Sequence, residues 1–150
     1  MIHIESKKDF SDTSLLERAV RFTLDAQSAA ENVDMTIVLT DDAQLHALNR
    51  GYLGVDAPTD VLSFPASESD PETGTRYLGD ILISIPRAAM QAEAAGHRAE
   101  EEVQLLVVHG TLHLLGHDHA EAEEKARMWK AQAAVMSRLG LSHVKILDTE

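Results

Sequence analysis

Four histidines fall within eleven residues in the second half of the chain, at His109, His113, His117 and His119. His109 and His113 are four residues apart, which on a helix places both side chains on one face with Cβ atoms about 5–6 Å apart. Two imidazoles at this spacing can each direct a nitrogen at a common metal ion about 2.0–2.1 Å away. Gly116 lets the chain reverse after such a helix, so His119 can return as a third ligand. The spacing therefore predicts one metal ion per chain, bound by His109, His113 and His119.

The donor set indicates which metal is bound and what it does. The chain has no cysteine, so a thiolate site is excluded. Three neutral nitrogens suit Zn²⁺ with a fourth position left to water, although nitrogen ligands alone also suit Ni²⁺ and Fe²⁺. Zinc held in this way lowers the pKa of its water to about 7, so a metal-bound water is the predicted catalytic group. We expect His117 at the rim, because a fourth protein ligand would close the site.

The spacing His-x3-His-x2-Gly-x2-His also occurs in zinc peptidases, which carry a glutamate as general base directly after the first histidine. This chain has Gly110 at that position, so peptide hydrolysis is the weakest of the enzymatic hypotheses. A glycine inside a helix costs about 1 kcal/mol relative to alanine. Its presence therefore predicts close backbone packing at Gly110, or space kept free beside the metal.

The element that must carry the first two histidines is a buried helix. Most positions from Val103 to Leu115 are apolar, and a helix that is apolar all round is buried. Three glutamates at 100–102 favour its N-terminus, where the helix dipole attracts negative charge. A final helix is expected over about 120–139, with Trp129, Ala133 and Met136 facing inward.

The remaining patterns predict an α+β domain with one small sheet. Alternating or continuous apolar runs predict strands over 1–5, 33–40, 61–64 and 80–85. Apolar residues at helical spacing and capping residues predict helices over 12–27, after Asp41-Asp42, and from Pro86 to Gly96. A polar loop is expected from Ser67 to Arg76. The length of 150 residues suits a single domain, 1–150.

Composition excludes several classes of protein. The net charge of −12 argues against a surface coated in positive charge for nucleic acid. The chain has no run of 18 apolar residues and no signal-peptide pattern, so we expect no membrane partner. The absence of cysteine fits a reducing cytoplasm. Aromatic residues make up only 4%, which does not support binding by base stacking.

Four segments together resemble the YbeY family of bacterial rRNA maturation factors, over nearly the whole chain. The most specific is His109-Gly-Thr-Leu-His-Leu-Leu-Gly-His-Asp-His119, and Thr59-Asp-Val-Leu-Ser-Phe-Pro65 is nearly as telling. Leu48-Asn49 and Leu78-Gly-Asp-Ile81 agree in order and spacing.

The resemblance implies a metal-dependent endoribonuclease directed at single strands, with His109, His113 and His119 as zinc ligands and a mixed sheet. Such an enzyme would act in 3′-end maturation of 16S rRNA and in ribosome quality control. Its partners would be the small ribosomal subunit, ribosomal proteins and an assembly GTPase. An alternative is a ribosome-assembly factor whose zinc is mainly structural and which has little nuclease activity.

One position departs from the family pattern. An arginine usually follows the Asn-x-x-Tyr segment, but Leu53 stands there in this chain. An arginine would neutralise the scissile phosphate through two hydrogen bonds, which leucine cannot do. We expect Arg50 to supply this charge for the substrate.

The expected reaction is hydrolysis, in which metal-bound hydroxide, or an RNA 2′-hydroxyl that it activates, attacks phosphorus. A carboxylate behind the metal ligands would accept the proton or orient a histidine. The candidates are Asp80, Asp60 and Asp118, for which backbone hydrogen bonding is at least as good an explanation.

Overall fold

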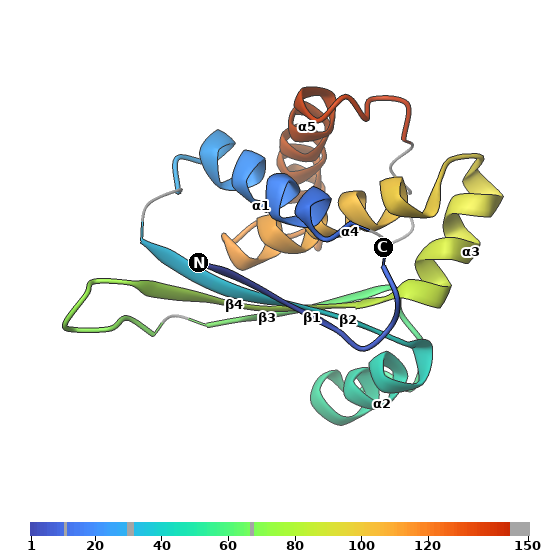
Figure 1. Cartoon of the computed structure of the whole chain (residues 1–150), viewed down its shortest axis with the longest axis horizontal. Helices are drawn as coiled ribbons and strands as arrows, with labels where there is room; N and C mark the ends of the chain where they lie inside the picture. The colour runs from blue at the N-terminus through green and yellow to red at the C-terminus, as the bar shows by residue number, and fades with distance from the viewer. Residues whose placement is uncertain (11, 30–31, 67, 145–150) are drawn as a thin grey trace.

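A sheet of four strands forms the centre of the part of the chain that the structure describes, residues 1–10, 12–29, 32–66 and 68–144 (Figure 1). This structure is a computed structural model. The strands are β1 (Ile2–Ser6), β2 (Val33–Thr40), β3 (Val61–Pro65) and β4 (Arg76–Ser84). The helices are α1 (Ser14–Ala26), α2 (Asp42–Leu53), α3 (Ile85–Ala95), α4 (Ala99–Leu114) and α5 (Ala122–Arg138).

The strand order is β1-β2-β4-β3, so β3 is an edge strand. β1, β2 and β4 run parallel, whereas β3 runs antiparallel to β4. The predicted α+β fold and the mixed sheet implied by the family resemblance are therefore both confirmed.

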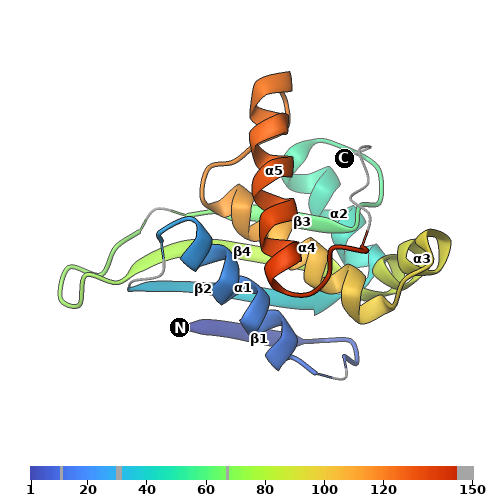
Figure 2. The same cartoon turned by 90° about the horizontal axis from the view of Figure 1, so that it is seen from above.

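Helices cover the two faces of the sheet unequally. Figure 1 shows α1, α4 and α5 on one side and α2 alone on the other, and Figure 2 shows the first group from above. The main core joins α1, α4 and α5 to the face of the sheet that carries Ile37 and Ile81. A smaller core packs Leu45 of α2 against Leu62 and Leu82 on the opposite face. Successive side chains along each strand therefore point to opposite faces of the sheet, as the two-residue period of a strand requires.

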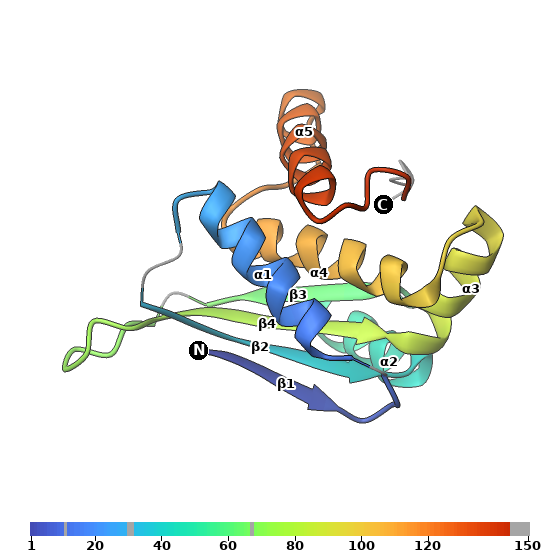
Figure 3. The same cartoon turned by 45° about the horizontal axis from the view of Figure 1, so that its top comes forward.

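α4 is the central helix of the larger layer, as its apolar sequence predicted. It packs against α1, α3, α5 and the strands β3 and β4 (Figure 3). Nearly every residue from Glu102 to Leu112 is buried. The helix ends at Leu114, and Gly116 follows with a φ of 100°, a left-handed conformation that glycine adopts without strain.

The sequence prediction was wrong at the start of β4 and, on the inner face of α5, for Ala133, whereas Met136 is buried as predicted. β4 begins at Arg76, which the predicted loop included, because its N–H donates to the carbonyl of Asn32 and pairs it with the start of β2. Ser67, the first residue of that predicted loop, lies outside the described residues. On α5, Ala133 is exposed and Trp129 only half-buried. The buried residues of α5 are Met128, Gln132, Val135 and Met136.

None of the helices in the described ranges is both long enough and apolar enough to cross a membrane.

Candidate metal centre

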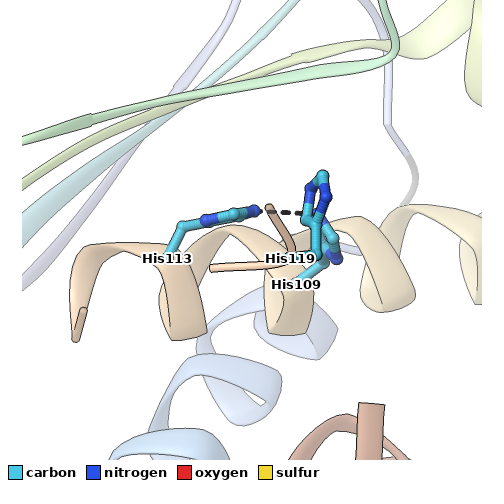
Figure 4. Close-up of side chains that lie close together, drawn as sticks. All are labelled: His109, His113 and His119. Carbon is cyan, nitrogen blue, oxygen red and sulfur yellow. Dashed lines mark hydrogen bonds between the residues drawn. The ribbon is translucent and has the colours of Figure 1, made fainter. Parts of the chain in front are cut away.

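The structure brings the three predicted ligands together. His109 and His113 project from the same side of α4, and His119 returns from the turn that follows Gly116 (Figure 4). One ring nitrogen from each histidine lies within 4.8 Å of the others. The ring centroids are 4.7 Å apart for His109 and His113, and 5.1 Å apart for His113 and His119.

The geometry of the cluster fits a metal ion. The Nε2 atoms of His109 and His113 are 3.2 Å apart. Two nitrogens that are each 2.0–2.1 Å from a tetrahedral zinc ion would lie about 3.3 Å apart. The pair therefore needs almost no movement to hold one ion, and His119 is close enough to complete a three-nitrogen site.

Gln132 of α5 fixes the orientation of His109. Its Oε1 lies 2.9 Å from Nδ1 of His109, and both side chains are buried. An amide oxygen only accepts hydrogen bonds, so Nδ1 carries the proton and Nε2 keeps its lone pair for a metal. The sequence analysis missed Gln132. The signal available there was a polar residue four positions after Met128 on the buried side of the last helix.

Burial keeps the first two ligands neutral. Burial, together with the nearby His113, lowers the pKa of His109 to about 4. Burial also lowers the pKa of His113, and His119 adds to this effect. Both imidazoles are therefore unprotonated at neutral pH, which is the state that binds a metal.

Two neighbouring side chains complete the surroundings of the cluster. The Trp129 ring meets His109 and His119 edge-on, with centroids 5.9 and 5.5 Å away. Nε2 of His117 lies 2.8 Å from Oε1 of Gln27, outside the three-histidine group. Trp129 thus packs against the back of the site, while His117 lies at its rim.

The three histidines line one wall of an open cleft of about 730 Å³. The cleft runs beside the edge strand β3 and is also lined by the loop from Leu53 to Asp60 and by α3. Among the described residues that line it, Arg87 of α3 is the one lysine or arginine.

The structure does not place Arg50 where the sequence analysis expected it. Arg50 is exposed on α2 and does not line the cleft, whereas Leu53 does. The cation present is Arg87, whose Nε and Nη2 each donate to Asp42 at 2.8 Å. A guanidinium has five N–H donors, so three remain for another ligand. The sequence does not reveal this position, because Arg87 reaches the cleft through the packing of α3 against α4 and β4.

The three candidate carboxylates are placed very differently. Asp60 is 3% exposed, lines the cleft, and has one oxygen, Oδ2, without a hydrogen-bond partner in the described part of the chain. Asp118 is exposed at the rim and accepts a hydrogen bond from the His119 N–H at 2.7 Å. Asp80 precedes Ile81 on β4 and so faces the other side of the sheet, where it accepts a hydrogen bond from Tyr77. The structure therefore brings Asp60 and Asp118 to the cleft but not Asp80.

Gly110 lies where α4 crosses β4. A Cβ atom there would be 2.9 Å from Cγ2 of Ile81 and 3.0 Å from its Cδ1. Of the two explanations the sequence left open for this glycine, the structure supports close packing of the helix on the sheet. A glutamate at this position would clash with the sheet, so the general base of zinc peptidases has no room here.

Comparisons with known proteins agree with this arrangement. A family model described as "Endoribonuclease YbeY" matches residues 1–140. Proteins of the same name from Roseiflexus castenholzii and Desulfitobacterium hafniense are 48% and 47% identical to the chain. The alignments cover 87% and 86% of this chain, and 86% of each relative. A solution structure of a Thermotoga maritima protein is similar over the full length of both chains, with a TM-score of 0.59 and 25% identity.

Proposed function

Because the chain belongs to the YbeY family of endoribonucleases, we propose that it is a zinc-dependent enzyme that hydrolyses phosphodiester bonds in single-stranded RNA. The observation that supports this proposal most strongly is the convergence of three imidazoles on one wall of an open cleft. Zn²⁺ bound there would supply a Lewis acid that activates water and offsets charge on the phosphate.

The residues of the chain have distinct proposed tasks. His109, His113 and His119 hold the ion, and Gln132 keeps the His109 ring in the required tautomer. Arg87, held in place by Asp42, donates its remaining N–H groups to a phosphate of the substrate. It takes the role that the sequence analysis gave to Arg50.

Asp60 is the carboxylate best placed to take up a proton during the reaction. It is buried at the cleft beside the histidines, and its negative charge acts on His109. Asp118 remains a candidate for orienting His119 from the rim. Asp80 has no such role in this proposal, since it lies on the far face of the sheet.

We further propose that residues 1–150 form one hydrolase domain that works in the cytoplasm. There it would mature the 3′ end of 16S rRNA and contribute to ribosome quality control. Its partners would be the small subunit, its ribosomal proteins and an assembly GTPase. Family membership supports this setting.

One observation favours the alternative of an assembly factor with a structural zinc. Leu53, exposed at the cleft, stands where an arginine is usual, and this weakens the case for efficient cleavage. The two functions differ in what metal removal does, because a structural zinc contributes to folding and a catalytic zinc need not.

The experiment is zinc stoichiometry by elemental analysis, paired with cleavage of a labelled single-stranded RNA. The wild type should hold one zinc per chain and cleave the RNA. His113→Ala should lose both properties while its circular dichroism spectrum is kept. His117→Ala is the matched control and should retain its zinc. Loss of the fold on zinc removal, without any cleavage by the wild type, would support the structural alternative.

A further inference from the structure

The strand beside the metal centre has an open edge. β3 pairs with β4 on one side, and the described residues add no strand on its other side. β3 and the three histidines line the same cleft. The backbone edge of β3 is therefore open to a substrate strand bound in this cleft.

The register of the sheet decides which backbone groups of β3 are free. Ser84 N–H donates to the carbonyl of Asp60, and Ala66 N–H donates to the carbonyl of Leu78. In an antiparallel pair, opposite residues alternate between pairs that exchange hydrogen bonds and pairs that do not. The even-numbered residues therefore bond to β4. The residues whose backbone groups point outward are Val61, Ser63 and Pro65.

Two side chains agree with this assignment. Proline has no N–H and occurs in sheets at positions that need no ladder bond, and Pro65 occupies such a position. Thr59 Oγ1 lies 3.5 Å from the carbonyl of Val61, which is therefore turned away from β4. The outward edge offers the N–H groups of Val61 and Ser63 as donors, and the carbonyls of Ser63 and Pro65 as acceptors.

We propose that this edge binds the sugar–phosphate backbone of the RNA strand, in a contact that rests on the proposed function. The N–H groups of Val61 and Ser63 donate to phosphate oxygens, and the carbonyl of Ser63 accepts from a ribose 2′-hydroxyl. The two N–H groups are two residues apart, about 6.6 Å along a strand, which is similar to the separation of successive phosphates in an extended chain.

The alternation of donors and acceptors favours RNA as the occupant. RNA presents acceptors at each phosphate and a donor at each 2′-hydroxyl, whereas DNA lacks the donor. A peptide could also pair with a strand edge, but Gly110 removes the general base that peptide hydrolysis would need. The described residues that line the cleft include no Phe, Tyr or Trp, so backbone contacts replace base stacking there. Such contacts carry no sequence information, so the site would accept varied sequences.

The test compares Ser63→Pro with Ser63→Ala. Both changes remove the Ser63 hydroxyl. Proline also removes the outward N–H but spares the ladder to β4, whereas alanine keeps that N–H. Binding of a labelled single-stranded RNA to the zinc-loaded variants is measured by fluorescence anisotropy at low temperature, before cleavage is detectable on a gel. Ser63→Pro loses a hydrogen bond to a charged phosphate, so it should bind the RNA about tenfold more weakly than Ser63→Ala does. The salt dependence should be unchanged, because an amide releases no counterion.

A second measurement uses the wild type, in case Ser63→Pro does not fold. Single 2′-deoxy substitutions along an RNA only long enough to span the cleft, which has one binding register, should weaken binding at one or two adjacent nucleotides only. A flat deoxy scan, or equal RNA affinity of the two variants, would overturn the edge contact while leaving the nuclease proposal intact. Tight binding of an extended peptide that competes with RNA and is weakened by Ser63→Pro would assign the edge to a protein partner instead. A wild type that neither binds nor cleaves single-stranded RNA contradicts the proposed function itself.

Discussion

The tautomer of His109 links α5 to the metal centre. A buried imidazole whose Nδ1–H lacks an acceptor can rotate or shift its proton to Nε2, which removes the lone pair that a metal needs. The 2.9 Å contact to Gln132 prevents this. Ligand orientation therefore depends on a residue 23 positions further along the chain.

Gln132→Leu should lower zinc affinity, measured by competition with a chromophoric chelator, by about 10- to 100-fold. The change keeps the side-chain size but leaves the Nδ1–H unpartnered. Gln132→Glu retains an acceptor and should restore much of the affinity. Equal affinities for the wild type and Gln132→Leu would show that the contact does not orient the ligand.

The depressed pKa values of His109 and His113 predict how stability depends on pH. Below the ordinary pKa of 6.5 the unfolded chain protonates these imidazoles, while the folded chain resists protonation until His109 titrates at about 4. The unfolded state therefore binds more protons in this window, and stability falls as pH falls. Urea denaturation of the metal-free protein should show a declining free energy of unfolding from pH 6.5 toward 5. His109→Leu should show a smaller decline, and an equal decline would contradict this explanation.

The residues of the centre differ in how far the sequence could predict them. The three ligands follow from local spacing, because a four-residue separation on a helix and a glycine turn determine their directions. Gln132 and Arg87 reach the site only through the packing of α5 and α3, which no local pattern encodes. Asp80 lies within a family segment but faces away from the metal centre, because the direction of its side chain depends on the register in which β4 pairs with its neighbours.

At the level of elements, the close packing of α4 on the sheet depends on a residue that has no side chain. Gly110 allows the helix backbone that carries His109 and His113 to approach Ile81 of β4 closely. The sequence predicted the helix and its burial from composition alone. On α5 it predicted the buried Met136 but assigned Ala133 to the inner face, because hydrophobicity favours alanine there over the polar Gln132, which is the residue that is buried.

Gly110→Ala should lower the free energy of unfolding. Overpacking costs about 1–3 kcal/mol, and the better helix propensity of alanine returns about 1 kcal/mol of that. The expected net loss in urea denaturation is therefore up to about 2 kcal/mol. Gly51→Ala in α2 is the matched control and should be neutral or stabilising, since no atom outside its chain neighbours and its own helix backbone lies within 4 Å of the point where its methyl group would stand. A stabilising Gly110→Ala would mean that Ile81 moves aside freely.

At the scale of the whole molecule, an acidic protein is proposed to bind an acidic polymer. The chain has a net charge of −12, and Arg87 is the one lysine or arginine among the described residues of the cleft. Most of the affinity must then come from neutral hydrogen bonds and the metal. Long-range attraction contributes little.

RNA binding should therefore depend only weakly on salt. One phosphate contact gives a slope of log affinity against log salt of about −0.7 for a single strand. Leu53→Arg should steepen the slope to about −1.4 and raise the cleavage rate, because it adds a cation at the cleft. Arg50→Met, outside the cleft, should leave the slope unchanged. A wild-type slope steeper than about −3 would show that other basic residues contact the strand.

The bare edge of β3 also exposes the protein to self-association. Unpaired strand edges are templates on which a second copy can add its own strand and begin aggregation. Pro65 interrupts the row of donors at one end of β3, and the strand is only five residues long. The strong negative charge makes copies repel one another at low ionic strength. Resistance to aggregation favours a covered edge, whereas substrate binding requires an open one. A short edge that ends in a proline satisfies both.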